Sequence, residues 1–345
     1  MATYLITGGS GFFGSIMKRT LLERGDYCVN IDLQADPYLH DHLTSIQGDI
    51  RDSELMEKIF KKHQFDAIFH FAALLAHVKK DKKNLWSNNV DGTRCVLKCA
   101  EKYHVKKIIF TSSNCLWAQN FDYPITEEEN PHPIEIYGKS KLEGENILLT
   151  ESTAVNSVIF RCPTIIDEGR LGLLAILYEF IDEGRKVWLV GDGSNRYQFI
   201  YAQDLVKACL LALEYPQSDI FNIGSDNVKT FNETYTYVIK KSGSKSRLAH
   251  FPKKLAIWGM KMCYVLGISP LGPYQYRMIS SSFIFDTSKI KEKLGFTPTL
   301  TNEEMMLKSY TYYHKNRDEI KQRKNASAHN VSAKMGVIRI LKWLS

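Results

Sequence analysis

Residues 135–145, EIYGKSKLEGE, place Tyr137 four positions before Lys141. In a helix these two side chains lie on one face, one turn apart. A phenol has a pKa of about 10 and is a weak base at neutral pH, but a neighbouring ammonium group favours the phenolate. Such a pair could exchange a proton with a substrate hydroxyl. An ordinary surface helix shows the same spacing, so the surrounding elements must decide.

The first half of the chain alternates short apolar runs with helical patterns. Strands are expected at residues 3–8, 27–33, 66–73, 106–113 and 156–166, and helices at 14–25, 53–63 and 88–105. This alternation indicates an α/β fold with a Rossmann-type doubly wound parallel sheet, covered by helices on both faces. After about residue 170, strand-like segments mix with helices. We therefore expect a smaller mixed α/β C-terminal lobe that binds the substrate.

A glycine-rich loop, LITGGSGFFG, joins the first expected strand to the first helix. Glycines at this spacing let the backbone turn tightly and approach a pyrophosphate, and the N–H groups that open the helix then face the anion. The loop predicts a dinucleotide cofactor bound by Gly8, Gly11, Phe12, Phe13 and Gly14.

Acidic residues follow the second expected strand and a further short strand expected just before GDIRD, residues 48–52. Asp32 ends the second strand, where a carboxylate accepts hydrogen bonds from an adenosine ribose and repels a 2′-phosphate. This favours NAD over NADP. Asp49, with Ile50 beside it, could reach the adenine amino group. Either aspartate could instead cap a turn, and for Asp49 the two interpretations are nearly equal.

A nicotinamide cofactor gives the tyrosine and lysine a role. Tyr137 would exchange a proton with a substrate hydroxyl while hydride moves to or from NAD, and Lys141 would favour the phenolate. Ser113 lies at the carboxyl end of an expected strand, where such sites are built. Its hydroxyl could bond the same substrate oxygen.

The chain resembles the extended short-chain dehydrogenase/reductases of the NAD-dependent epimerase/dehydratase family. The resemblance runs from residue 3 to about 313, through TGGSGFFG, Asp32, GDIRD, HFAA, NNVDGT, TSS, YGKSK, GDGSNRYQFIYAQDL, FNIGS and LGFTPT. It implies that Ser113, Tyr137 and Lys141 form the catalytic triad. It further implies that Asn89 braces the active-site helix beside the cofactor, and that NAD is lined by Ala72, Ala73 and Pro163.

Departures from the family pattern narrow the chemistry. The 4,6-dehydratases carry an Asp-Glu pair where this chain has Asn114 and Cys115, so dehydration is not expected. Many nucleotide-sugar enzymes have an asparagine at Thr164 and a diphosphate-binding arginine at Tyr197. Arg196 is adjacent and could substitute. The segment RCPT together with the changed arginine is similar to epimerases of polyprenyl-diphosphate-linked N-acetylhexosamines, which share an apolar segment like residues 255–273; a core helix is the alternative for that segment.

Composition limits the partners and the compartment. The net charge is +7, yet no ordered array of basic and aromatic residues indicates a nucleic-acid partner. The seven cysteines show neither a C-x-x-C pair nor zinc spacing, so no metal site is predicted and a cytoplasmic location is expected. The N-terminus enters a strand directly, which leaves no room for a signal peptide.

We expect four segments. Residues 1–167 form the NAD-binding domain, to which residues 195–225 return; residues 168–313 form most of the substrate lobe; residues 314–330 form a polar linker; and residues 331–345 form an amphipathic basic tail. In the tail, a helical projection separates an apolar arc containing Trp343 from Lys334, Arg339 and Lys342. This pattern predicts attachment to the cytoplasmic membrane face, with docking on the protein itself or on a partner as alternatives.

The sequence thus predicts an NAD-dependent sugar epimerase that acts at C4 of a hexose on a diphosphate carrier, nucleotide or polyprenyl, through a transient keto-sugar. A net reductase or dehydrogenase of a keto-sugar or sterol-like alcohol is the first alternative. A non-catalytic dinucleotide sensor or assembly subunit is the second, although such proteins commonly lose the Tyr or Lys. The resemblance also suggests a homodimer.

Overall fold

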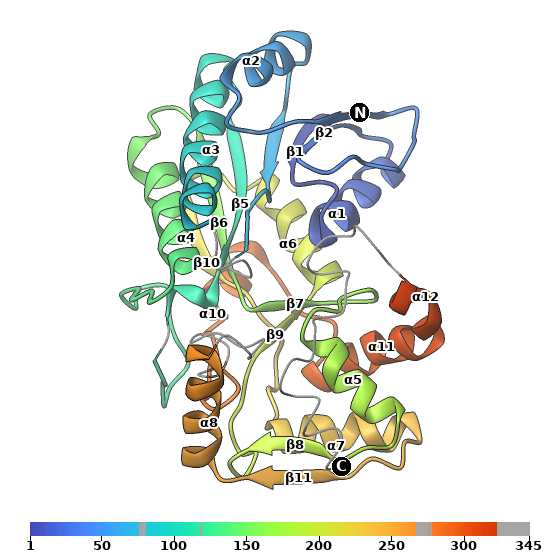
Figure 1. Cartoon of the computed structure of the whole chain (residues 1–345). Coiled ribbons are helices and arrows are strands. Elements are labelled where there is room, and N and C mark those ends of the chain that lie inside the picture. Colours follow the sequence, from blue (N-terminus) through green and yellow to red (C-terminus); the bar gives the residue numbers. More distant parts are fainter. Residues whose placement is uncertain (76–80, 118, 267–275, 277, 323–345) are drawn as a thin grey trace.

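The computed structural model describes residues 1–75, 81–117, 119–266, 276 and 278–322 (Figure 1). Seven parallel strands form one sheet in the order β10-β6-β5-β4-β1-β2-β3. Their bounds are β1 Thr3–Thr7, β2 Tyr27–Asp32, β3 Leu43–Gln47, β4 Ala67–His70, β5 Lys107–Ser113, β6 Asn156–Cys162 and β10 Asp219–Asn222. The predicted Rossmann-type sheet is confirmed, and its order reverses between β1 and β4.

Helices cover both faces of this sheet because each face carries its own apolar core. One core joins α1 (Phe12–Glu23), α6 (Ala202–Leu213) and α10 (Ser288–Leu294) to the strands. The other lies beneath α2 (Ser53–Lys62) and α3 (Lys82–Lys102). Beside α3 on that second face lie α4 (Ile136–Asn146) and the π-helical turn η2 (Ile147–Glu151). The 3₁₀ turn η1 (Asn114–Leu116) contacts α4.

A second unit, in the lower half of Figure 1, has a core of its own. It contains α5 (Leu174–Asp182), α7 (Phe231–Ser242), α8 (Lys253–Val265), α11 (Asn302–Lys315) and α12 (Arg317–Gln322). Strand β8 (Val187–Val190) pairs with β11 (Leu248–Phe251), and β7 (Thr164–Ile166) pairs with β9 (Phe199–Tyr201). In Figure 1 the β7–β9 pair crosses the middle of the molecule, between the large sheet and the lower helices.

Two sequence-based boundaries are wrong for identifiable reasons. The strand expected at 156–166 is two strands in different sheets, because Pro163 lacks the N–H that would continue the ladder. The helix expected from residue 88 starts at Lys82. Asp81 caps it by accepting a hydrogen bond from the Asn84 backbone at 2.9 Å, a signal that the apolar pattern does not contain.

The predicted polar linker is also wrong in its first part. Residues 317–322 form α12, and Ile320 is buried in the core of the lobe. Arg317 pairs with Asp182 at 2.6 Å and Glu183 at 2.8 Å. The segment looked like a linker because all of its residues except Ile320 are polar or charged. The predicted tail, residues 331–345, lies outside the described residues. In the part of the chain that the structure describes, no helix is both long and apolar enough to cross a bilayer.

Candidate active site

The glycine loop turns between β1 and α1 with no room for a side chain at Gly8 or Gly14. Gly8 has a φ of +76°, and a Cβ there would lie 2.7 Å from the Ala72 backbone nitrogen. A Cβ on Gly14 would lie 2.2 Å from the Gly8 carbonyl oxygen. Both positions therefore require glycine, and the loop lies at the sheet's reversal between β1 and β4.

Helix α1 presents an end that suits an anion. Gly11 is its N-cap, no side chain caps this end, and its first turn contains no acidic residue. Phe12 and Phe13 open the helix with buried side chains. The N–H groups of the first turn and the positive end of the helix dipole thus fit a pyrophosphate.

Asp32 connects this loop to the end of β2. Its carboxylate accepts hydrogen bonds from the Ser10 backbone at 3.0 Å and the Gln34 backbone at 2.9 Å. The residue is half-buried, so part of the carboxylate stays open to a ribose hydroxyl. Together, the loop, the α1 end and this carboxylate fit NAD.

Asp49 and Ile50 have partners within the protein. Asp49 pairs with Arg51 at 2.5 Å, and this hydrogen-bonded pair holds the pKa of the carboxyl below its usual value. Arg51 in turn donates to the Asn84 side chain on α3 at 2.8 Å. Ile50 is buried beneath α3, where a Cβ on Gly92 would lie 2.5 Å from its Cδ1. Cofactor contacts by Asp49 and Ile50 stay predictions.

Asn89 joins three elements near the carboxyl end of β4. Its amide donates to the Leu74 carbonyl at 3.1 Å and to the Ser140 hydroxyl on α4 at 2.9 Å. Its oxygen accepts from the Leu74 backbone at 2.7 Å. Asn89 thus fixes the segment containing Ala72 and Ala73 against the helix that carries Tyr137.

The three predicted catalytic residues lie together. Ser113 is the last residue of β5, and its hydroxyl accepts a hydrogen bond from the Cys115 backbone at 3.1 Å. Tyr137, in the first turn of α4, lies close enough to Ser113 for that hydroxyl to lower the pKa of the phenol. Lys141 is one turn later, almost fully buried, with Nζ 4.0 Å from the centroid of the Phe110 ring.

Burial dominates the protonation of this group. It raises the pKa of Tyr137, while the charge of Arg170 and the hydrogen bond with Ser113 lower it. Burial lowers the pKa of Lys141 to about 8, although the negative charge of Glu145 raises it. Glu145 is held by a buried ion pair with Arg161 at 2.8 Å. Because burial opposes ionisation of the Tyr137 phenol, formation of the phenolate depends on the positive charges held near it.

Three predicted substrate residues also meet. The Asn114 amide donates to the Tyr197 hydroxyl at 2.6 Å, and the Thr164 hydroxyl lies 3.4 Å from the same oxygen. Tyr197 is buried against the rings of Phe199, Phe231 and Phe283. Pro163, also buried, leads from β6 into the strand that carries Thr164.

Arg196 does not join this cluster. It is exposed, and its charge acts on Glu233 of α7. Successive residues of an extended segment point to opposite sides, and Tyr197 takes the inner side here. The suggestion that Arg196 substitutes for an arginine at position 197 is therefore not supported by the structure.

Arg170 was missed at the sequence level. It follows β7, and its guanidinium carbon lies 5.6 Å from the centroid of the Phe12 ring in the glycine loop. Its charge also acts on Tyr137. A basic residue shortly after a strand's carboxyl end, in IIDEGR, was the available signal.

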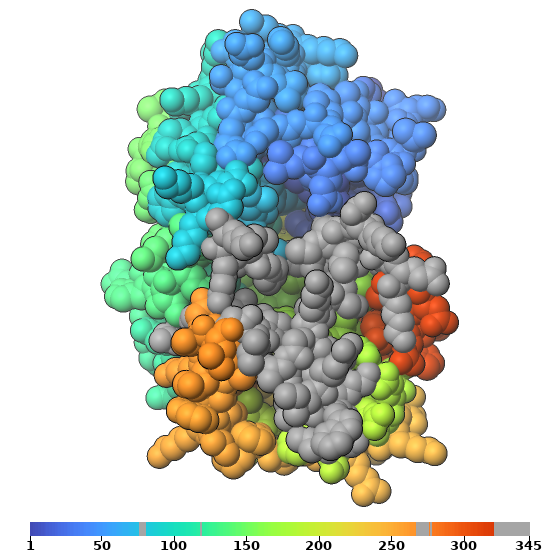
Figure 2. All heavy atoms as spheres, viewed as in Figure 1, coloured from blue at the N-terminus to red at the C-terminus, as the bar shows by residue number. Residues whose placement is uncertain are grey.

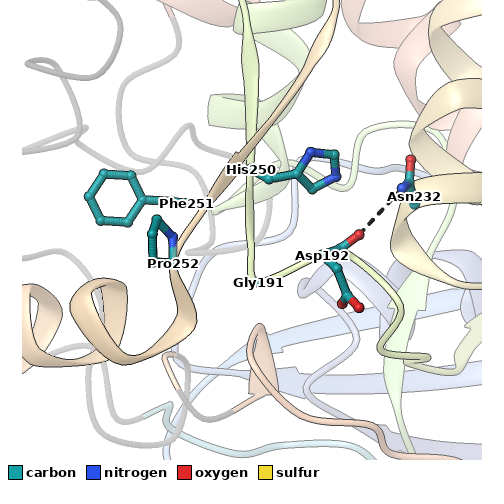
Figure 3. A pocket seen from close by; sticks show the side chains of 6 residues that line it. All are labelled: Gly191, Asp192, Asn232, His250, Phe251 and Pro252. Carbon is teal, nitrogen blue, oxygen red and sulfur yellow. Dashed lines mark hydrogen bonds between the residues drawn. The ribbon is translucent and has the colours of Figure 1, made fainter.

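A separate hollow lies in the C-terminal unit, where β8 and β11 end (Figure 3). It is lined by Gly191, Asp192, Asn232, His250, Phe251 and Pro252, and the Asn232 amide donates to the Asp192 carbonyl at 3.3 Å. None of the predicted catalytic or cofactor-binding residues lines this hollow.

Comparison with known proteins identifies the family. Residues 4–224 match the model of the NAD dependent epimerase/dehydratase family. The chain is 31% identical to the protein y4nG of Sinorhizobium fredii, over 99% of this chain and 86% of that one. It is 26% identical to UDP-glucose 4-epimerase of Lactobacillus helveticus, over 90% of this chain and 96% of that one.

A solved structure gives the same result. UDP-glucose 4-epimerase from Thermotoga maritima, with UDP-glucose, superposes with a TM-score of 0.75 at 27% identity, covering 91% of this chain and 99% of that one. The family match extends over more than half of the chain. The protein therefore belongs to the NAD-dependent epimerase/dehydratase family and is an enzyme whose cofactor is NAD.

Proposed function

We propose that this enzyme epimerises C4 of a hexose carried on a diphosphate. The observation that carries the proposal is the meeting of Ser113, Tyr137 and Lys141 at the carboxyl end of β5, in the domain that holds the glycine loop. Relatives named as UDP-glucose 4-epimerases support the C4 position.

In the proposed reaction each of the three residues has one step. The Ser113 hydroxyl donates to the substrate oxygen and holds it beside Tyr137. The Tyr137 phenolate accepts the proton of that hydroxyl, and the Lys141 ammonium stabilises the phenolate beforehand. NAD, held by the glycine loop and Asp32, would supply reversible hydride transfer with C4 of the sugar. Tyr137 then gives the proton back to the same oxygen, so no net oxidation results.

The groups after Ser113 fit this chemistry better than dehydration. Loss of water needs an acid and a base near the sugar. The Asn114 amide is neutral, and its N–H is donated to Tyr197. Cys115 contributes its backbone N–H to Ser113. A net reductase remains the alternative, because the same triad would serve it.

For the carrier we propose a polyprenyl diphosphate. Tyr197 replaces the arginine expected for a nucleotide diphosphate, and α8 has an apolar outer face. That face, here called the α8 stripe, consists of Leu255, Trp258, Met262, Val265 and Leu266. Trp258 is 62% exposed and Val265 79% exposed, and no residue of α8 is buried. In Figure 2, α8 is the orange group at the surface of the lower unit.

Charge favours an anionic bilayer as the partner of this face. The spacing places the five apolar residues on one side of α8. Lys254 and Lys261 flank them on the helix, and α8 contains no Asp or Glu. A basic helix with an exposed apolar side is typical of membrane-surface contact. Contact through the tail and a homodimer stay predictions alongside it.

In the test, purified enzyme and NAD are incubated with UDP-N-acetylhexosamines and, separately, with their polyprenyl-diphosphate counterparts. NMR of the sugar should show inversion at C4 without net change in nicotinamide absorbance. Tyr137→Phe should lower the rate by about 100- to 10,000-fold while NAD still binds, because it removes the proton acceptor.

Other outcomes separate the alternatives. Stoichiometric reduction of NAD without an epimer would identify a dehydrogenase. Biological activity that survives Tyr137→Phe would identify a sensor. Turnover of the UDP-sugars but not the polyprenyl-linked sugars would refute the proposed carrier and leave the C4 chemistry in place.

A further inference from the structure

A substrate diphosphate needs a cationic side chain to neutralise its charge. Many nucleotide-sugar enzymes of the family have an arginine for this purpose where this chain has Tyr197. That hydroxyl accepts from Asn114 and is surrounded by aromatic rings. The neighbouring Arg196 is exposed, and its charge acts on Glu233. Another residue must neutralise the diphosphate.

Arg170 is held near the centre of the site by a fixed turn. The turn follows β7, with the Arg170 backbone donating to the Asp167 carbonyl at 3.1 Å and Gly169 at a φ of +80°. The Ser309 hydroxyl of α11 donates to the Arg170 carbonyl at 3.4 Å. The position of Arg170 is therefore set by both the β7 end and α11.

The side chain of Arg170 lies near aromatic rings, and none of the described residues forms an ion pair with it. Its guanidinium is 5.6 Å from the Phe12 ring, and its charge interacts with the hydroxyls of Tyr137 and Tyr197. Among the described residues, no carboxylate pairs with it; the adjacent Asp167 and Glu168 lie 3.4 and 3.9 Å from Lys308 instead. A half-buried charge left unpaired costs stability, which is expected where an anionic ligand completes the site.

We propose that Arg170 is the arginine that binds a diphosphate in this active site. The diphosphate could belong to NAD, near Phe12, or to the substrate, near Tyr197, because both ligands carry the same group. Only the assignment to the substrate rests on the proposed function. Burial lowers the pKa of Arg170 to about 10, so the guanidinium stays charged at neutral pH. Its planar fork suits two phosphate oxygens at once.

Calorimetry on the whole chain tests the proposal. The ligands are NAD, UDP and farnesyl diphosphate, each beside its monophosphate counterpart AMP, UMP or farnesyl phosphate. Arg170→Gln should weaken at least one diphosphate by about 30-fold or more and its monophosphate counterpart much less. Arg170→Lys should recover part of the loss. The diphosphate whose affinity falls in Arg170→Gln identifies whether Arg170 binds the cofactor or the substrate.

Two further variants and a melting curve make the result decisive. Arg247→Gln, at an exposed arginine of the C-terminal unit, should bind all ligands like wild type. Without ligand, Arg170→Gln should melt no lower than wild type because an unpaired charge is gone. Unchanged diphosphate affinities in Arg170→Gln, or a loss seen in Arg196→Gln instead, would overturn the proposal. Equal loss for both ligand classes with a lower melting temperature would make Arg170 merely structural.

These binding results are independent of turnover. If Arg170→Gln binds diphosphates normally while the wild type inverts C4, the role of Arg170 is wrong and the epimerase stands. If Arg170→Gln loses affinity for NAD while the wild type forms no epimer, Arg170 binds a diphosphate as proposed and the proposed epimerase activity is wrong.

Discussion

Lys141 shows that a residue of the predicted catalytic triad can be unfavourable for the fold. It is 3% exposed, it faces the Phe110 ring, and burial lowers its pKa from 10.5 to about 8. Below pH 8 the folded enzyme holds a desolvated ammonium that the unfolded chain holds in water. The pKa difference corresponds to about 3 kcal/mol against folding.

We therefore predict that Lys141→Met abolishes activity and stabilises the NAD-free enzyme. At pH 7 the free energy of unfolding should rise by up to about 3 kcal/mol. The lysine loses its proton first in the folded state, so wild-type stability should increase between pH 8 and 10.5 and the advantage of the variant should disappear there. Thermal melts across this pH range measure both effects.

Lys139→Met is the matched control, because Lys139 lies on the same helix and is exposed. It should leave the pH dependence of melting unchanged. A Lys141→Met variant that melts lower than wild type at pH 7 would contradict the desolvation argument.

At the scale of elements, α4 is the part that brings the predicted catalytic residues together. Tyr137, Lys141 and Glu145 are four residues apart and share one face of it. Asn89 holds α4 from α3, and Arg161 holds it from β6 through Glu145. Gly138 lets α4 approach η1, directly after β5, since a Cβ there would lie 2.2 Å from the Cys115 carbonyl oxygen.

Gly138→Ala should therefore push α4 away from β5 and separate Tyr137 from Ser113. We expect a loss of about 1–3 kcal/mol in unfolding free energy from overpacking. The rate should fall about tenfold or more, because catalytic groups lose rate steeply when they are misplaced. Steady-state kinetics and chemical denaturation measure these changes.

Gly259→Ala on α8 provides the comparison, because a Cβ there meets nothing within 4 Å. It should leave kinetics unchanged and stabilise the enzyme by up to about 1 kcal/mol through helix propensity. Wild-type kinetics in Gly138→Ala would show that the close approach of α4 is not required.

At the scale of the whole molecule, the α8 stripe predicts association with anionic membranes. The enzyme should sediment with vesicles of phosphatidylglycerol and phosphatidylcholine, and less with phosphatidylcholine alone. The double variant Trp258→Glu, Val265→Glu should reduce binding by about tenfold or more, because it places charges in the apolar face. Higher salt should weaken binding by screening the lysines.

Leu39→Glu is the control for this experiment, since Leu39 is 90% exposed but lies in the first domain. It should bind vesicles like wild type. If the α8 double variant keeps full binding and deletion of residues 331–345 removes it, the tail is the contact. Failure of wild type to bind anionic vesicles would refute the membrane proposal while leaving the C4 chemistry untouched.

Local patterns predicted the first domain well. The strand–glycine loop–helix unit at residues 3–23 was recognisable because φ > 0 and close backbone approach need glycine at Gly8 and Gly14. The Tyr137–Lys141 spacing likewise requires only a helix. Prediction was poorer where distant contacts define an element: α12 depends on Asp182 and Glu183, which are far away in the sequence.

The sequence by itself determined the parallel sheet, the cofactor loop and the helix that carries Tyr137, because periodicity and backbone conformation are properties of neighbouring residues. Tertiary structure alone decided which polar residues meet. It turned Arg196 outward, enclosed Tyr197 with Asn114 and Thr164, and brought Arg170 to Phe12. Such meetings depend on how β7 crosses from the large sheet into the second unit, and no local pattern encodes the direction of that crossing.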